Sequence, residues 1–134
     1  LTLAMIEAAR AKGLPNAEFV LGDAENLPFD DASFDAVLCS NSFHHYPNPE
    51  AFLREARRVL RPDGKLILRD YTSSDFVVWL MNTFELPLAR LAGHGDVRIL
   101  KISEFRELAL AAGFAIERLE AQRGFRAHLV ARKM

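Results

Sequence analysis

Cysteine is nearly absent from this sequence: Cys39 is the single one among 134 residues, so no internal disulfide can form. It falls inside an apolar run, where a cysteine commonly packs as a small hydrophobic side chain. The first ten residues also lack the basic leader and apolar block of a secretory signal. We therefore expect a reduced, cytoplasmic setting.

Neither sign of charge is in excess, since 17 Lys and Arg residues stand against 18 Asp and Glu residues and the net charge is -1. A basic nucleic-acid-binding face and an acidic tail are therefore not expected. Long hydrophobic runs are missing as well. The longest apolar stretch, 76–91, is shorter than the roughly 20 residues that span a bilayer, and it contains Glu85, Pro87 and Arg90. We expect no membrane span.

The sequence also lacks a serine nucleophile motif, a phosphate-binding loop and a cluster of metal ligands. His94 and His128 stand alone, and one cysteine cannot complete a zinc site of ordinary spacing. We therefore expect no metal site.

What is present is the composition of a globular protein, with 50% apolar and 26% charged residues. A chain of this length buries roughly two thirds of its unfolded surface, which is enough for a core. We expect a single domain over residues 1–134.

Two segments have the pattern of buried strands joined by a helix. Residues 34–39 form a short apolar run bounded by polar residues, which is typical of a strand covered on both faces, and we expect it to be the central strand. Asn48 and Pro49 suit the cap and first turn of the next helix. Residues 65–71 complete a strand, helix, strand unit, which is right-handed and parallel.

The remaining segments predict shorter elements around this unit. We expect helices at 1–12 and 75–90, a helix capped by Ser103 and ended by Gly113, a strand at 18–21, a turn at 24–29, and an antiparallel hairpin of strands 114–122 and 125–133.

The loop after the first buried strand is the place to look for chemistry, because ligands of open α/β sheets lie beyond the carboxyl ends of the strands. Ser40 and Asn41 end the strand, and His44 and His45 come next as an adjacent titratable pair. An imidazole can take a proton from a hydroxyl, an amine or an acidic carbon near neutral pH. The alternative is that these histidines are structural hydrogen bonders and that Ser40 and Asn41 only terminate the strand.

Three stretches in this order carry a family resemblance: GDAENLPF, then SFDAVLCSNSFHHYPNPEAFLREARRVLRPDGKLIL, then AGF before the two final strands. Together they resemble the class I S-adenosylmethionine-dependent methyltransferases. The likeness is strongest to the small-molecule group that includes the ubiquinone and menaquinone biosynthesis enzymes, and it runs from Leu1 to the end of the chain.

The resemblance implies an α/β, Rossmann-like sheet that is parallel with one antiparallel C-terminal strand. The family has a glycine-rich turn after its first strand and an acidic residue at the end of its second, and neither is found in this sequence. Residues 1–5 match the short segment that the family has directly after that acidic residue. The resemblance therefore implies a domain truncated at the N-terminus, with the first two strands missing.

The resemblance also implies roles for individual residues around the cofactor, S-adenosylmethionine. Asp23 and Ala24 would read the two edges of the adenine, with Leu27 and Met5 beside the base. Ser40 and Asn41 would lie where cofactor and acceptor meet. For Asp23 the alternative is a cap of the turn after it, and for Leu27 and Met5 it is core packing.

Further residues would line an acceptor pocket. Asp70 and Tyr71 end the second buried strand beside the same crevice. The segment 72–100 is the family's variable region and would build a lid. The apolar face of 76–91 suits a hydrophobic acceptor, although core or dimer packing explains it as well.

The function expected from this resemblance is methyl transfer to a small, apolar acceptor by in-line displacement, with His44 or His45 as the catalytic residue. The sulfonium methyl is already activated, so the protein has to align the acceptor and exclude water. The alternative is a non-catalytic fragment with weak or absent cofactor binding. It would form a homodimer, or pair with another chain, through the exposed edge at 36–39 or through the helix at 76–91. A nicotinamide dehydrogenase is a more distant alternative.

Overall fold

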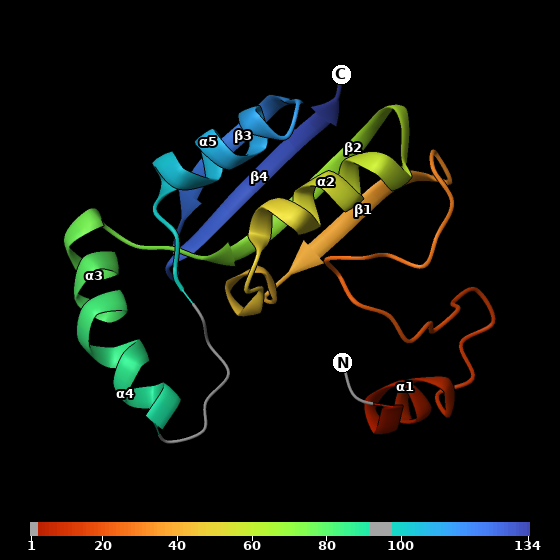
Figure 1. Cartoon of the computed structure of the whole chain (residues 1–134), viewed down its shortest axis with the longest axis horizontal. Helices are drawn as coiled ribbons and strands as arrows, with labels where there is room; N and C mark the ends of the chain where they lie inside the picture. Colours follow the sequence, from red (N-terminus) through yellow and green to blue (C-terminus); the bar gives the residue numbers. More distant parts are fainter. Residues whose placement is uncertain (1–2, 92–97) are drawn as a thin grey trace.

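The computed structural model describes residues 3–91 and 98–134. One four-stranded mixed sheet organises them, with helices at its face and at its ends (Figure 1). The elements in chain order are α1 (Leu3–Arg10), β1 (Phe34–Ser40), the 3-10 helix η1 (Phe43–His45), α2 (Pro49–Val59), β2 (Leu60–Tyr71), α3 (Asp75–Leu80), the π-helix η2 (Met81–Glu85), α4 (Leu86–Leu91), α5 (Ile102–Ala111), β3 (Phe114–Gln122) and β4 (Arg126–Lys133).

The sheet has the strand order β1-β2-β4-β3. Strand β1 runs parallel to β2 and is joined to it by α2, as the strand, helix, strand pattern predicts. Strand β4 is antiparallel to both β2 and β3. The predicted class, a parallel α/β sheet with one antiparallel C-terminal strand, is confirmed, and so is the final hairpin.

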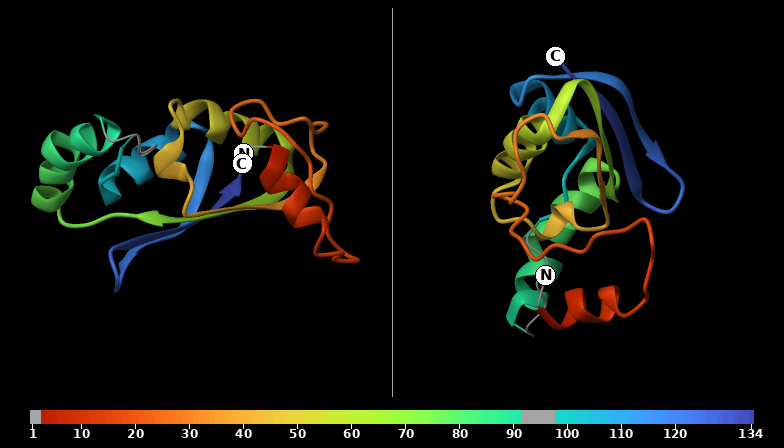
Figure 2. Two further views of the ribbon diagram at one scale, coloured as in Figure 1. Left: turned by 90° about the horizontal axis from the view of Figure 1, so that it is seen from below. Right: turned by 90° about the vertical axis from the view of Figure 1, so that its right-hand side faces the viewer.

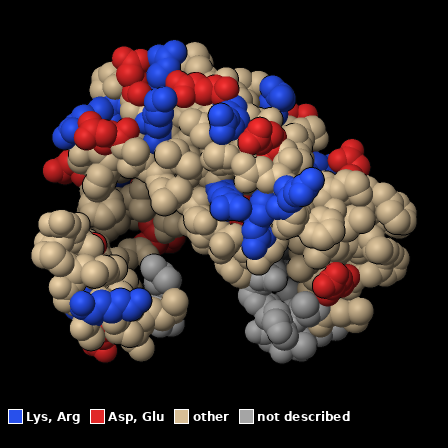
Figure 3. Space-filling model, turned by 180° about the vertical axis from the view of Figure 1, so that it is seen from behind, with Lys and Arg blue, Asp and Glu red and all other residues tan. Residues whose placement is uncertain are grey.

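Helices α2 and α5 cover one face of this sheet (Figure 2). Because side chains alternate along a strand, Leu66, Leu68 and Asp70 of β2 point to the same face, and all three are buried. The intervening residues point to the face that carries neither α2 nor α5, where Lys and Arg side chains are interspersed with Asp and Glu (Figure 3). The main core lies under the two helices and includes Phe43, Phe52, Leu53, Ala56, Leu60, Leu66, Leu68, Phe105, Phe114 and Leu129.

The prediction that residues 34–39 form a central strand covered on both faces is wrong. Among the described residues, β1 pairs only with β2 and is an edge of the sheet. Five of its seven residues are exposed, and Leu38 is 69% exposed. The expected free edge on this strand is confirmed.

The strand predicted at 18–21 does not form, and no strand of the described residues lies beside it to take up its hydrogen bonds. Its backbone finds a side-chain partner: the guanidinium of Arg10 donates to Phe19 O from Nε at 3.0 Å and from Nη2 at 2.7 Å. The predicted first helix is confirmed over Leu3–Arg10, and it lies away from the sheet (Figure 1).

The apolar stretch after β2 is helical from Asp75 to Leu91, with a π-helical turn in its middle. A small second core of Val78, Leu86 and Ile99 supports it. The Asn82 amide fastens it by donating to Ile99 O and accepting from Ile99 N, at 2.8 and 3.0 Å. Much of its apolar surface stays open, including Phe76, Trp79, Leu80, Phe84 and Leu88. The sequence predicts that residues 93–96, with two glycines, end this helix, and these residues lie outside the described ones.

The predicted cap of α5 is wrong by two residues, because Lys101 and not Ser103 occupies that position. The Glu104 carboxylate accepts from the Lys101 backbone N–H at 2.8 Å, which fixes the start of the helix. Gly113 follows the C-cap residue Ala112 at φ +81°, as predicted for the glycine that ends the helix. None of the helices in the described ranges has the length and hydrophobicity that a bilayer crossing requires.

Candidate functional site

The C-terminal ends of β1 and β2 lie side by side and carry most of the predicted polar residues. After Ser40 the chain turns at Asn41, which adopts φ +52° and donates its N–H to Arg69 O at 2.9 Å. This bond holds the loop against the end of β2. A hollow opens between helix α1 on one side and helices α3 and α4 on the other, below the sheet in the view of Figure 3.

His44 and Asp70 form a buried pair at this point. His44 Nδ1 lies 2.6 Å from Asp70 Oδ1, and the His44 backbone N–H donates to Asp70 Oδ2 at 3.1 Å. The side chains are 8% and 1% exposed, so water screens the interaction little. A carboxylate at Nδ1 favours the tautomer whose proton is on that nitrogen, which leaves Nε2 as the basic position.

His45 and Tyr71 complete the surroundings of the His44 ring. The two imidazole centroids are 4.0 Å apart, and the Tyr71 ring meets His44 edge to face at 5.0 Å. His45 itself is exposed. The two histidines predicted to act near the acceptor are therefore neighbours with different surroundings, and the buried carboxylate orients only His44.

A second polar cluster, which the sequence does not predict, lies at the end of β1. Ser42 Oγ is 3.1 Å from the Tyr46 hydroxyl and 3.3 Å from Cys39 Sγ. Burial raises the pKa of Tyr46 to about 12 and also raises the pKa of the Cys39 thiol. Both groups stay protonated near neutral pH, so they act here as hydrogen-bonding and packing groups. The expected packing of Cys39 as a small hydrophobe is confirmed.

Residues 23–27, which follow the strand predicted at 18–21, lie against α2 and the residue before it. Asp23 Oδ1 accepts from the Glu25 N–H at 2.9 Å. This contact caps the turn, which is the predicted alternative to adenine binding by Asp23. Glu25 Oε1 accepts from the Asn48 N–H at 2.8 Å, and Glu55 Oε2 accepts from the Leu27 N–H at 2.9 Å. These bonds place residues 23–27 beside the loop that carries the histidines.

Arg58 holds the rest of this segment in place, a role that the sequence does not predict. Its guanidinium donates to the carbonyls of Leu27 and Phe29 at 3.0 and 2.8 Å and pairs with Asp31 and Glu55. The hydrogen bond from Arg58 lowers the pKa of Glu55, and Glu55 in turn raises the pKa of Arg58. A helix residue with this many distant partners holds the loop in one conformation.

A cavity of about 530 Å³ runs along β1 and brings the two segments together. Ala24 and Leu27 line it on one side, and Ser40 and Ser42 line it on the other. Asp23 and Asn41 are immediate chain neighbours of these residues. Met5, on α1, is not among the residues that line this cavity, and 56% of it is exposed. The roles of these residues stay predictions. The rest of the lining is mostly apolar: Phe29, Phe34, Ala36, Val37, Leu38, Cys39, Tyr46, Phe52 and Val59.

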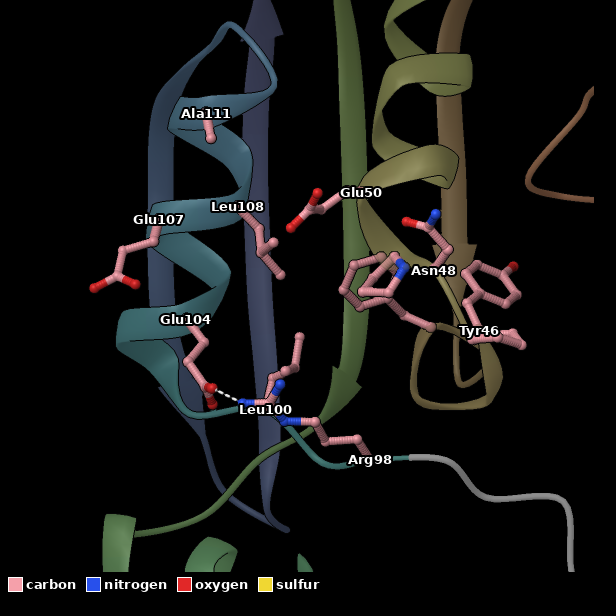
Figure 4. Close-up of a pocket in the computed structure, with 12 residues that line it drawn as sticks. Tyr46, Asn48, Glu50, Arg98, Leu100, Glu104, Glu107, Leu108 and Ala111 are labelled. Carbon is pink, nitrogen blue, oxygen red and sulfur yellow. Dashed lines mark hydrogen bonds and ion pairs between the residues drawn. The ribbon is translucent and has the colours of Figure 1, made fainter.

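Another cavity of about 530 Å³ lies between α2 and α5 (Figure 4). Glu50 of α2 and Leu108 of α5 point toward each other across it, and Glu104 at its lower end pairs with Arg98. Glu107 also belongs to its lining. The excess of carboxylates makes it a poor site for an anionic ligand, and none of the residues predicted to bind cofactor lines it. Among the described residues no group of His, Cys, Asp and Glu side chains is arranged to hold a metal ion.

The known proteins with sequences or folds similar to this chain include methyltransferases. The model of a methyltransferase domain family matches residues 1–68. A phthiotriol/phenolphthiotriol dimycocerosates methyltransferase of Mycobacterium ulcerans is 45% identical over 84 residues, covering 62% of this chain and 31% of the relative. The uncharacterized methyltransferase YcgJ of Bacillus subtilis is 34% identical over 112 residues, covering 84% of this chain and 44% of the relative.

Among solved structures, a SAM-dependent methyltransferase of Thermotoga maritima is similar with a TM-score of 0.75 and 26% identity. The similarity covers 98% of this chain and 70% of that one. The chain spans less than half the length of the two curated relatives.

Proposed function

This chain belongs to the methyltransferase domain family, and we propose that it takes part in the transfer of a methyl group from S-adenosylmethionine to a small acceptor. S-adenosylmethionine is the methyl donor of this family. Its methyl group is bound to a sulfonium and needs no further activation, so the protein's task is to align the acceptor and to remove the proton that the acceptor loses.

The observation that carries the proposal is the buried pair of His44 and Asp70 at the ends of β1 and β2. In the proposed mechanism, His44 Nε2 takes the proton from an acceptor hydroxyl, and S-adenosylmethionine, when bound, would supply the methyl group to that oxygen. Asp70 keeps the ring in the required tautomer and stabilises the imidazolium that forms. His45, which is exposed beside it, is the second histidine proposed to contact the acceptor.

The cavity along β1 is the place proposed for the donor. Its apolar lining suits an adenine, and Ala24, Leu27 and Ser40 all border it. Asp23 would then accept from the exocyclic amine and Asn41 would lie near the sulfonium. The Mycobacterium ulcerans relative is named for triol acceptors, which supports a hydroxyl as the methylated group. The apolar face of α3 and α4 supports an acceptor that is otherwise apolar, with 72–100 as its lid.

A methyl-transfer assay tests this proposal. Labelled S-adenosylmethionine is incubated with the chain and a set of phenols and long-chain alcohols, and transfer is compared between the wild type, His44→Gln and the control His128→Gln. General-base catalysis contributes about 100-fold to 10,000-fold, so His44→Gln should lose at least that lower factor. The control should stay near the wild type, since His128 lies on β4 outside the loop. Equal rates for the wild type and His44→Gln would overturn the role of His44.

The free edge of β1 favours a second candidate function, a non-catalytic module that pairs with another chain. Within residues 3–91 and 98–134 no strand pairs with this edge beside Leu38, and such an edge is a template for strand addition. The two candidates differ in donor binding: the enzyme binds S-adenosylhomocysteine through the cavity, while the pairing module has no need to.

A further inference from the structure

Arg126 has a cationic side chain that forms no ion pair with any other described residue. It begins β4 and pairs in register with Tyr71 of β2, on the sheet face that carries neither α2 nor α5. The guanidinium carbon lies 3.7 Å from the centroid of the Tyr71 ring. Arg126 Nη1 is buried, and within residues 3–91 and 98–134 it has no hydrogen-bond partner. Buried polar atoms in native proteins nearly always have one.

Two carboxylates on the neighbouring strands β2 and β3 are already engaged. Asp70 accepts from His44 Nδ1 and from the backbone N–H groups of His44 and Tyr71. Glu120, on β3, accepts from Gln122 Nε2 at 3.0 Å and lies 4.0 Å from His128 Nδ1. Neither side chain forms an ion pair with Arg126 in the described part of the chain, so its charge is left for a ligand.

The position of Arg126 connects it to the proposed base. The Tyr71 ring carries the guanidinium over its face and meets the His44 ring edge to face at 5.0 Å. Arg126, Tyr71 and His44 thus form a continuous row across the ends of β4, β2 and β1. A guanidinium over an aromatic ring keeps its planar fork of N–H donors, and that fork matches the two oxygens of a carboxylate.

We propose that Arg126 and Tyr71 form a carboxylate-binding subsite beside His44. The carboxylate accepts from Nη1 and Nη2 of Arg126, and the adjoining part of the ligand packs against the Tyr71 ring. Such a carboxylate has two sources, an acidic acceptor or the methionine part of the donor. The subsite's place in methyl transfer rests on the function proposed above, whereas the binding of a carboxylate does not.

Binding of small probes to the 134-residue chain tests the subsite. Benzoate and its uncharged analogue benzyl alcohol are titrated while the Nε–H signal of Arg126 and the ring signals of Tyr71 are followed by NMR. A hydrogen bond to a charged group makes benzoate bind about tenfold to a hundredfold more tightly than benzyl alcohol. Arg126→Gln should lose this difference, and the control Arg123→Gln, an exposed arginine of the same hairpin, should keep it within about twofold.

Arg126→Lys is a second variant, for the case that Arg126→Gln does not fold. It keeps the positive charge and loses the planar fork of donors, so it should bind benzoate with an affinity between those of the wild type and Arg126→Gln. Equal benzoate affinity in the wild type and Arg126→Gln, or no preference of the wild type for benzoate over benzyl alcohol, would overturn the subsite.

A second comparison identifies the source of the carboxylate. If Arg126→Gln weakens S-adenosylhomocysteine and leaves 5'-methylthioadenosine unchanged, the donor supplies the carboxylate, because only the former has a carboxylate. If neither changes while benzoate binding is lost, the acceptor supplies it. Arg126-dependent benzoate binding without any methyl transfer would leave the subsite standing and count against the proposed function alone.

Discussion

Asp70 ends β2 with both carboxylate oxygens occupied, one of them by the His44 ring. The sequence places this residue beside the crevice but does not reveal its partner. One signal was present: Asp70 comes after Leu66 and Leu68 at every second position, so it shares the face of the strand that packs under the helices. A carboxylate on a buried face needs a hydrogen-bond donor, and the histidine loop is the nearest source.

Asp70→Asn should therefore disturb His44 without unfolding the loop. An amide can still accept from Nδ1–H, but it can also donate to an unprotonated Nδ1, so the ring loses its preferred tautomer. ¹⁵N NMR of the imidazoles should show Nδ1 protonated in the wild type and a mixture of tautomers in the variant. We expect methyl transfer to fall about 10-fold to 100-fold at unchanged affinity for S-adenosylhomocysteine.

The control for this experiment is Asp63→Asn, which removes the carboxylate that pairs with Arg132 on the surface. Surface pairs contribute little, so both the tautomer and the rate should be those of the wild type. An unchanged His44 tautomer in Asp70→Asn would show that the carboxylate does not set the state of the ring.

Tyr46 makes the stability of the fold depend on alkaline pH. Burial raises its pKa to about 12, while an unfolded tyrosine titrates near 10. The phenol's contribution to stability is therefore complete below pH 10 and is lost as the pH rises toward 12. Urea unfolding at pH 9 and pH 11 should show a larger loss for the wild type than for Tyr46→Phe. Equal losses in the two proteins would mean that Tyr46 ionises freely in the folded state.

Among the elements, the helical segment from α3 to α4 is fastened to the rest of the fold by few contacts. Asn82 makes two hydrogen bonds to the backbone of Ile99, and Thr72 Oγ1 donates to Leu100 O at 2.8 Å. The apolar pattern of 76–91 predicts a helix, and this is confirmed. The pattern gives no indication of the π-helical turn, which contains Asn82.

Asn82→Ala should loosen this segment. Loss of both bonds leaves the N–H and C=O of Ile99 unsatisfied, which costs about 1–3 kcal/mol. Hydrogen exchange of the Ile99 amide should become faster by about tenfold or more, with the sheet unchanged. The neighbouring exposed residue supplies the control, Thr83→Ala, which should exchange like the wild type. Unchanged protection of Ile99 in Asn82→Ala would show that the small core alone holds the helices.

On the scale of the whole molecule, the sequence predicts the class of the sheet, its parallel unit and its hairpin correctly, because these depend on local patterns and short connections. It fails for 18–21 and for the position of β1. A residue pattern indicates whether a strand is suited to buried or exposed surroundings. The position of the strand in a sheet depends on which other strands are present. The site is limited in the same way. Ser42 and Tyr46 flank a 3-10 turn that residue periodicity does not predict, so the sequence does not predict their cluster with Cys39.

Association through the free edge of β1 is expected from the same geometry. Leu38→Asp places a charge on the exposed edge and should weaken self-association of the chain by about tenfold, as loss of one central apolar contact does. Sedimentation velocity over a concentration series measures it, with Leu110→Asp as the control, since Leu110 is a comparably exposed leucine on α5. A wild-type chain that stays monomeric at all concentrations would contradict self-association through this edge.

The proposed donor site is tested most directly by locating S-adenosylhomocysteine on the chain with backbone amide NMR. Two cavities of about 530 Å³ compete for it, one along β1 and one between α2 and α5. We expect shift changes at Ala24, Leu27, Ser40 and Asn41 that saturate with ligand. Shift changes confined to Glu104 and Glu107, or none at millimolar ligand, would contradict a donor site along β1.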